Sequence, residues 1–214
     1  LNILEGCRNH KVKHLVYASS SSVYGENKKV PFETTDNVDH PISLYAATKK
    51  SNELMAHTYG HSYGFKTTGL RFFTVYGPWG RPDMAYYLFA DAISNNRPIK
   101  VFNNGEMERD FTCINDIVNG VTKIIEKNID SREHYKIYNI GNNKTESLQD
   151  FITTIEEALG REAIKELHPM QQGDVPRTFA NVDELIKDYE YKPNTTIKNG
   201  LREFIDWYRM YNNK

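Results

Sequence analysis

The segment HLVYASSSSVYG (residues 14–25) and the two that follow it, SLYAATKKSNELMAHTYGHSYG (43–64) and KTTGLRFFTVYG (66–77), decide the fold. The first opens with a short apolar run, which is typical of a buried parallel strand. The second has apolar residues at helical spacing, and the third is rich in β-branched and aromatic residues, which favours a strand. Strands that alternate with helices predict an α/β domain with a parallel sheet.

Three further segments extend this pattern toward the C-terminus. YKIYNIG (135–141) predicts a third strand, which we expect to return to the first domain. The capping-box pattern and apolar stripe of residues 147–160 predict a helix, and residues 201–208 have the same helical spacing. We therefore expect a partial Rossmann-like, doubly wound parallel sheet in residues 1–77 and a smaller C-terminal substrate-binding α/β domain in residues 78–214.

The composition of the 214-residue chain excludes several classes of protein. A formal net charge of -1 gives no electrostatic basis for binding nucleic acid or an anionic membrane. No apolar run approaches the ~18 residues that a membrane span needs. Cys7 and Cys113 are isolated, which fits a reducing cytoplasm. His57 and His61 lie one helical turn apart, but no third ligand is evident, so we predict no metal site.

Two segments of the chain are candidates for chemistry. The serines of residues 19–22 follow a predicted strand, and ligands in open α/β sheets bind outside the carboxyl ends of strands. A solvated turn accounts for these serines equally well. Tyr45 and Lys49 are four residues apart and therefore share one face of the predicted helix. An ammonium group near a phenol favours the phenolate, a usable base, although such a pair also recurs by chance.

In their order along the chain, these motifs resemble the extended short-chain dehydrogenase/reductase family, and within it the UDP-sugar 4-epimerases, especially those acting on UDP-glucuronate. The resemblance runs through YASSSSVYG, PISLYAATKKSNE, LRFFTVYGPWGRPD, ERDFTCINDIV, YNIGN and MQQGDVPRTFAN. It implies Ser20, Tyr45 and Lys49 as the catalytic set and NAD as the cofactor, contacted by Tyr45, Lys49 and Phe72. Tyr45 would take the proton of the sugar 4-OH while NAD takes the C4 hydride and returns it to the other face of the 4-keto sugar.

Four positions distinguish between the reactions and substrates of the related enzymes. Ser21 and Ser22 stand where dehydratases and decarboxylases of the family carry acidic residues, so epimerisation is favoured. Thr74 and Arg81 match the uronate-specific members, and a guanidinium suits a carboxylate. We therefore expect UDP-glucuronate to be converted to UDP-galacturonate. An ordinary surface cation is the alternative interpretation of Arg81.

The resemblance assigns further contacts with the UDP-sugar. Arg109 matches the residue that binds the pyrophosphate, and Asp174 the one that holds the uridine ribose. Gln171 stands where galactose-type epimerases have an arginine, which leaves that phosphate contact open. Phe102 is expected beside the uracil or in the core. The family's pattern also implies a homodimer, formed in part by the helix that contains Tyr45.

One feature of the family does not occur in this sequence. Its members open with a Gly-rich turn that binds the NAD pyrophosphate. We therefore expect about the first hundred residues of the family's organisation to lie outside these 214 residues, and the chain alone to be inactive. The alternatives are a UDP-glucose or UDP-N-acetylglucosamine 4-epimerase, a related nucleotide-sugar dehydratase, and a non-catalytic remnant that binds UDP-sugar.

Overall fold

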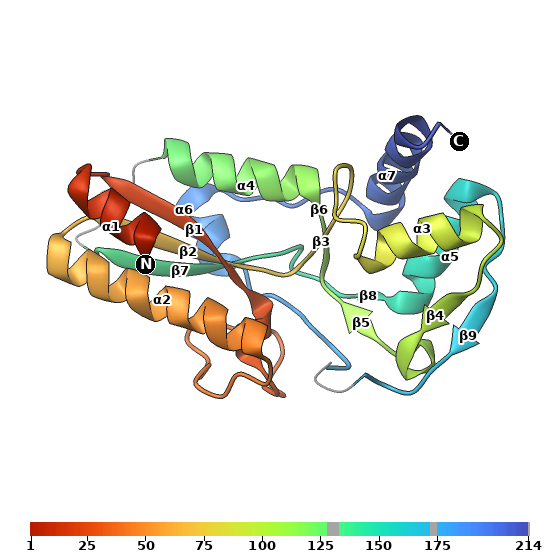
Figure 1. The fold of residues 1–214 in the computed structure, drawn as a ribbon, viewed down its shortest axis with the longest axis horizontal. Coiled ribbons are helices and arrows are strands. Elements are labelled where there is room, and N and C mark those ends of the chain that lie inside the picture. Colours follow the sequence, from red (N-terminus) through yellow and green to blue (C-terminus); the bar gives the residue numbers. More distant parts are fainter. Residues whose placement is uncertain (128–132, 172–174, 214) are drawn as a thin grey trace. The chain divides into compact units, whose positions relative to one another are not determined.

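The computed structural model describes residues 1–127, 133–171 and 175–213, and these form two compact units (Figure 1). The first unit consists of Leu1–Phe73, Asn119–Gly141 and Ala180–Lys192. The second consists of Thr74–Val118, Asn142–Phe179 and Pro193–Lys214. The first segment of the first unit thus ends at Phe73, whereas the sequence predicts a boundary at residue 77. Two later segments of the chain also belong to this unit, and not only the strand predicted at 135–141.

The first unit contains a parallel sheet in which the described strands have the order β1-β2-β7. These strands are β1 (His14–Ser20), β2 (Lys66–Phe72) and β7 (Tyr135–Ile140), so the predicted strands at 14–19 and 135–141 are confirmed. Ser20 pairs with Phe72, and Phe72 pairs with Ile140. The carboxyl ends of the three strands therefore lie side by side at one edge of the sheet.

Helix α2 (Leu44–Tyr63) packs along this sheet and contacts all three strands. It begins where Ser43 Oγ accepts a hydrogen bond from the Ala46 N–H at 3.1 Å. It ends at Gly64, whose φ of 73° is the left-handed conformation that glycine adopts at little cost. These local signals explain why the helix predicted from the sequence is confirmed almost to the residue.

Two shorter helices also belong to the first unit. Helix α1 (Asn2–Asn9) contacts α2, and α6 (Asp183–Tyr189) contacts β7. Buried apolar residues of α1 and α2 pack together with Phe65, which precedes β2. The members of this cluster are Leu4, Cys7, Ala56 and Phe65. Burial of these side chains fixes α1 against α2 in the first unit.

The single strand predicted over residues 66–77 is wrong, because the chain forms two strands there. After β2, the strand β3 (Thr74–Tyr76) pairs with β6 (Phe111–Cys113) in the second unit. The Phe73 N–H still donates to the Ile140 carbonyl at 3.2 Å, but the next N–H donates to the Asp110 carbonyl at 3.2 Å. Successive amides thus bond into different sheets. Composition carries no sign of this change, because both strands are aromatic and β-branched.

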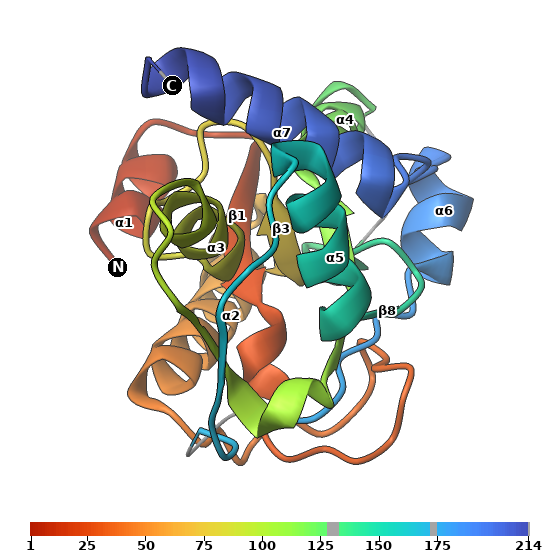
Figure 2. The same ribbon diagram turned by 90° about the vertical axis from the view of Figure 1, so that its right-hand side faces the viewer.

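The second unit has an apolar core between helices α3 (Ala85–Ser94), α5 (Leu148–Leu159) and α7 (Ile197–Tyr211), which Figure 2 shows packed together. The predicted helices at 147–160 and 201–208 are confirmed. At the centre of this core, the rings of Phe111 and Phe151 stack with their centroids 4.0 Å apart.

Short strands accompany this core. The strand pairs are β4 (Ile99–Val101) with β9 (Lys165–Leu167) and β5 (Glu108–Arg109) with β8 (Glu146–Ser147). Helix α4 (Ile114–Glu126) follows β6 directly, and its residues from Asn119 onward belong to the first unit. In the part of the chain that the structure describes, no helix combines the length and the apolar character needed to span a bilayer.

Candidate active site

The serine cluster lies at the carboxyl edge of the parallel sheet. β1 ends at Ser20, and the 3₁₀ turn η1 (Ser21–Tyr24) follows it. Ser20 Oγ accepts a hydrogen bond from the Ser22 N–H at 3.2 Å and lies 3.2 Å from the Ser22 hydroxyl. Ser20 is buried and Ser22 is exposed, so the turn leads from the sheet to the surface. This edge is the part of an open α/β sheet at which ligands bind.

Tyr45 and Lys49 share one face of the first two turns of α2. The Lys49 ammonium lies 5.7 Å from the centroid of the Tyr45 ring, within the range of a cation–π contact. Lys49 Nζ also donates to the Ala18 carbonyl at 3.1 Å, two residues before Ser20. Tyr45 is 54% exposed, so its hydroxyl is open to a ligand. A phenol beside an ammonium group is an arrangement suited to proton transfer.

The fourth residue of this group, Phe72, ends β2 directly opposite Ser20 and is half-buried. The first unit therefore brings Ser20, Lys49 and Phe72 to the same edge of the sheet, with Tyr45 beside Lys49. Lys49 uses one of its N–H groups on Ala18 and has two more to donate. Ammonium and phenol groups of this kind fit the ribose hydroxyls at the nicotinamide end of NAD.

The second unit contains the residues predicted to determine which sugar is bound. Thr74 begins β3 and is half-buried. Arg81 follows β3 in a loop, where its guanidinium lies 3.2 Å from the Asp83 carboxylate. The Arg81 side chain is 74% exposed, so this ion pair is solvated and weak. The guanidinium is therefore available to a second carboxylate.

The remaining predicted contacts also belong to the second unit. Phe102 is half-buried, with its ring centroid 5.5 Å from that of His168. The Arg109 guanidinium donates to the carbonyls of Glu108 and Pro176, both at 3.0 Å. Gln171 is exposed, and Asp174 lies outside the described residues. Arg109 is thus held by backbone carbonyls, which orient its other N–H groups.

Of the two histidines considered as metal ligands, His57 contacts an aromatic ring. His57 packs edge-on against Tyr135, with the ring centroids 4.9 Å apart. Within residues 1–127, 133–171 and 175–213, no three His, Cys, Asp or Glu side chains converge as metal ligands.

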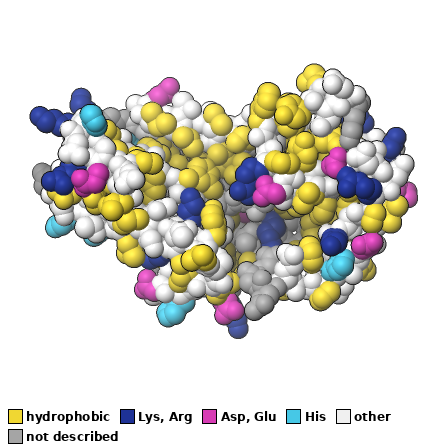
Figure 3. All heavy atoms as spheres, in the orientation of Figure 1, with side chains coloured by type: hydrophobic (Ala, Val, Ile, Leu, Met, Phe, Trp, Pro, Cys, Tyr) yellow, Lys and Arg dark blue, Asp and Glu magenta, His cyan; other side chains and the backbone are white. Residues whose placement is uncertain are grey.

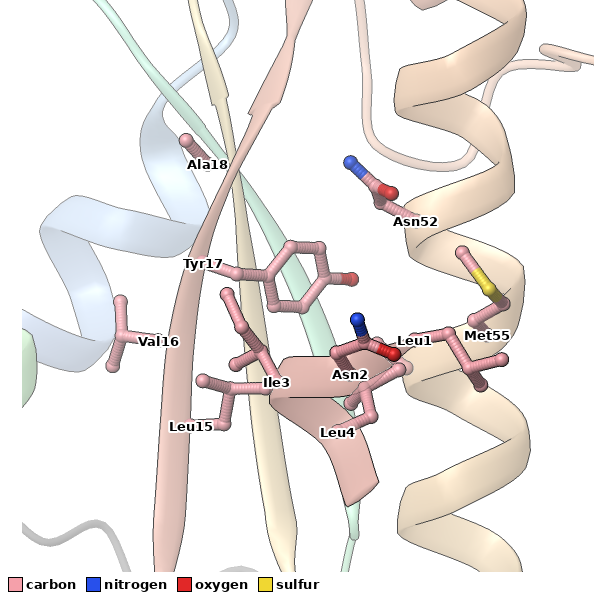
Figure 4. A pocket seen from close by; sticks show the side chains of 11 residues that line it. Leu1, Asn2, Ile3, Leu4, Leu15, Val16, Tyr17, Ala18, Asn52 and Met55 are labelled. Carbon is pink, nitrogen blue, oxygen red and sulfur yellow. The ribbon is translucent and has the colours of Figure 1, made fainter. Parts of the chain in front are cut away.

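A pocket of about 640 Å³ lies between α1, β1 and α2 (Figure 4). Apolar side chains dominate its lining, and the Tyr17 phenol and the Asn52 amide project into it. Burial raises the pKa of the Tyr17 phenol well above its usual value, so this hydroxyl stays protonated. The pocket reaches Ala18 but includes neither Tyr45 nor Lys49. Its volume is thus separate from the predicted chemistry.

Sequence reasoning missed a buried polar network behind the edge. Glu53, one turn beyond Lys49, is 1% exposed, and Arg71 in β2 is 3% exposed. Their side chains form a two-bonded ion pair with distances of 2.9 and 3.0 Å. The available signal was an arginine inside the otherwise apolar run LRFF, because a buried charge requires a partner.

The chain is similar to known proteins over nearly all of its own length. Residues 1–141 match the NAD dependent epimerase/dehydratase family. Protein CapI of Staphylococcus aureus is 53% identical, over 100% of this chain and 68% of its own. A probable UDP-glucuronate 4-epimerase of Rhizobium meliloti is 46% identical, over 97% of this chain and 65% of its own.

The fold of the chain is also similar to that of a solved structure. The crystal structure of UDP-glucuronic acid 4-epimerase from Bacillus cereus, in complex with UDP-glucuronic acid and NAD, superposes with a TM-score of 0.90 at 31% identity. The match covers 98% of this chain and 65% of that one. This similarity confirms the predicted Rossmann-like α/β fold. The chain spans about two thirds of the length of these relatives.

Proposed function

Because the chain belongs to the NAD dependent epimerase/dehydratase family, we propose that it carries the catalytic residues for 4-epimerisation of UDP-glucuronate to UDP-galacturonate. NAD dependence and nucleotide-sugar chemistry are those of its relatives. The observation that carries the proposal is the contact of Lys49 with both the Tyr45 ring and the carbonyl of Ala18, two residues before Ser20. The relatives from Rhizobium meliloti and Bacillus cereus support UDP-glucuronate as the sugar.

Three side chains divide the work at the sugar in this proposal. Tyr45 removes the proton of the 4-hydroxyl and returns it after the sugar has turned. Lys49 stabilises the phenolate and holds the nicotinamide ribose, and Ser20 donates a hydrogen bond to the same sugar oxygen. When bound, NAD supplies the hydride acceptor that no side chain provides. Phe72, at the neighbouring strand end, is proposed to contact the cofactor.

The other predicted residues serve recognition in this proposal. Ser21 and Ser22 bring hydroxyls and no carboxylate to the turn after β1, which favours epimerisation over water elimination. The proposed contacts with the UDP-sugar in the second unit are Thr74, Arg81, Phe102, Arg109 and Gln171. We also propose that the protein is located in the cytoplasm, because its two cysteines are not paired with each other.

The direct test is the identity of the product. The protein expressed from its complete gene is incubated with NAD and UDP-glucuronate, and the nucleotide sugars are separated and identified. We expect UDP-galacturonate, the same equilibrium ratio from either sugar, and no net reduction of NAD. A decarboxylated or dehydrated product, or turnover of UDP-glucose alone, would contradict the proposal.

Arg81→Ala is expected to raise the KM for UDP-glucuronate by about tenfold to a hundredfold and to change the KM for UDP-glucose much less. A charge-assisted contact of a guanidinium with a carboxylate is worth roughly 1.5–3 kcal/mol. Steady-state kinetics with both sugars measure the difference. Arg97→Ala is the matched control, because Arg97 is an exposed arginine of the same unit that also pairs with an aspartate. An equal rise for both sugars would assign Arg81 to folding.

A homodimer is the expected assembly, and exposed apolar side chains on α1 and α2 support it. Ile3 is 72% exposed, Leu44 83% and Leu54 57%, and Figure 3 shows hydrophobic side chains gathered over this part of the first unit. Large exposed apolar side chains on two helices that contact each other favour an interface there. Light scattering should give the mass of a dimer, and Leu54→Glu should lower it toward the monomer. Ile164→Glu, at an equally exposed position in the second unit, should leave the mass unchanged. A monomer before mutation would refute this assembly.

A further inference from the structure

Tyr45, Lys49 and Glu53 recur every four residues along α2, so the three side chains follow one face of the helix. The first two reach the candidate active site, and the third is almost completely buried. Glu53 Oε1 accepts a hydrogen bond from Ser19 Oγ at 2.6 Å and another from Arg71 Nε at 2.9 Å. Glu53 Oε2 accepts from Arg71 Nη2 at 3.0 Å. One carboxylate therefore ties α2 to β1 and to β2.

The other side of Arg71 extends the network. Arg71 Nη1 donates to Tyr24 OH at 3.0 Å, and the Tyr24 hydroxyl donates to Asn139 Oδ1 at 2.6 Å. Asn139, in β7, donates in turn to the Phe32 carbonyl at 2.8 Å. Burial raises the pKa of the Tyr24 phenol, while the charge of Arg71 acts in the opposite direction. Tyr24 thus remains a neutral donor at the centre of a continuous buried network.

This network binds both ends of the segment of residues 19–24, called the serine turn below. Ser19, immediately before Ser20, is bound to Glu53, and Tyr24, the last residue of η1, is bound to Arg71. The Lys49 bond to the Ala18 carbonyl is a third tie to the same stretch of chain. The Glu53–Arg71 pair therefore contacts both ends of the stretch of chain that carries Ser20.

Stability alone is a poor explanation for a buried ion pair. Removing two charges from water costs about as much as their attraction returns, and apolar pairs of similar volume are often as stable or more so. What a two-bonded arginine–carboxylate pair adds is a fixed geometry, because the planar guanidinium meets both oxygens at once. A pair of this kind at the back of a catalytic edge is suited to holding that edge in place.

We propose that the buried Glu53–Arg71 ion pair is the positioning element of the epimerisation site, setting the separation between the Ser20 hydroxyl and the Tyr45–Lys49 face of α2. The inference rests on the proposed function and adds two positioning residues to it. Neither Glu53 nor Arg71 needs to touch the sugar or the cofactor. A positioning role affects turnover through geometry, whereas a purely structural role affects only folding.

The double variant Glu53→Leu/Arg71→Met separates the two roles, because it removes both charges together and leaves no unpaired one. We expect the variant to fold with a Tm close to that of the unmodified protein. Its kcat should fall about a hundredfold, the loss typical of a displacement of about 1 Å, while the KM for UDP-glucuronate changes little. An unchanged kcat in the folded variant would overturn the proposal.

Ser19→Ala is the second variant, and it removes only the bond between the serine turn and Glu53. It should fold normally and lower kcat several-fold at a constant KM. A kcat equal to that of the unmodified protein would count against the proposal even if the double variant failed to fold. Glu184→Gln is the matched control, because it weakens the partly exposed Lys136–Glu184 pair of the same unit, and it should leave kcat unchanged.

Amide hydrogen exchange tests the positioning role without turnover. In the double variant, the amides of Ser22 and Gly25 should exchange at least about ten times faster, because local opening of the turn costs less free energy. Amides within β2, such as that of Leu70, should keep their rates. Unchanged exchange of the turn would overturn the proposal. If the unmodified protein expressed from its complete gene epimerises no UDP-sugar, the proposed function fails, and hydrogen exchange still decides the role of the Glu53–Arg71 pair.

Discussion

Tyr45→Phe is expected to lower the kcat for UDP-glucuronate epimerisation by about 10²–10⁴-fold, the usual contribution of a positioned proton-transfer group. The substitution removes one hydroxyl and keeps the ring against which the Lys49 ammonium lies. Tyr45 is 54% exposed, so the Tm and the circular dichroism spectrum should not change. Steady-state rates and a thermal unfolding curve from the same preparation measure both quantities.

A second tyrosine of α2 provides the control for this result. Tyr63→Phe makes the same chemical change at a position that is 45% exposed, at the far end of the helix. It should leave kcat and KM unchanged. A Tyr45→Phe protein that retains normal turnover would remove Tyr45 from the mechanism, and with it the central residue of the proposed function.

Phe151→Ala is expected to lower the free energy of unfolding by about 3–5 kcal/mol, the range for deleting a large aromatic side chain from a core. Phe151 is fully buried, stacks on Phe111 at 4.0 Å and meets the edge of the Tyr76 ring at 6.0 Å. The alanine would leave a cavity between β6, α5 and β3. Urea denaturation followed by fluorescence measures the loss.

Leu167→Ala is the matched control for the core substitution. Leu167 belongs to the same unit but is 61% exposed, so its loss should change the free energy of unfolding by no more than about 0.5 kcal/mol. A small effect of Phe151→Ala, comparable with that of the control, would mean that the core repacks around the missing ring.

The elements that carry the candidate site were predictable because their signals are local. The limits of α2 follow from Ser43 and Gly64, which satisfy the helix ends within a few residues of sequence. The division at Phe73 was not predictable, since it depends on which distant strand offers the next carbonyl. Strands of two or three residues, such as β5 and β8, are too short to show a period.

Some residues of the candidate site could be proposed from the sequence, and others could not. Tyr45 and Lys49 follow from a helical spacing, and the resemblance to a family added Ser20. The partnership of Glu53 with Arg71 was not visible, because a sequence does not state which of its many charges will be buried together. Only the packing of α2 on the sheet brings these two residues, 18 positions apart, into contact.

The Lys49–Ala18 bond has a consequence for the thermodynamics of ligand binding. A free lysine side chain has about 2 kcal/mol of rotamer entropy to lose when a ligand immobilises it. Here the chain restrains that side chain when it folds, so little of this loss falls on the binding step. The restraint uses a main-chain oxygen, and the Ala18 side chain is exposed. The bond itself therefore requires no particular side chain at position 18.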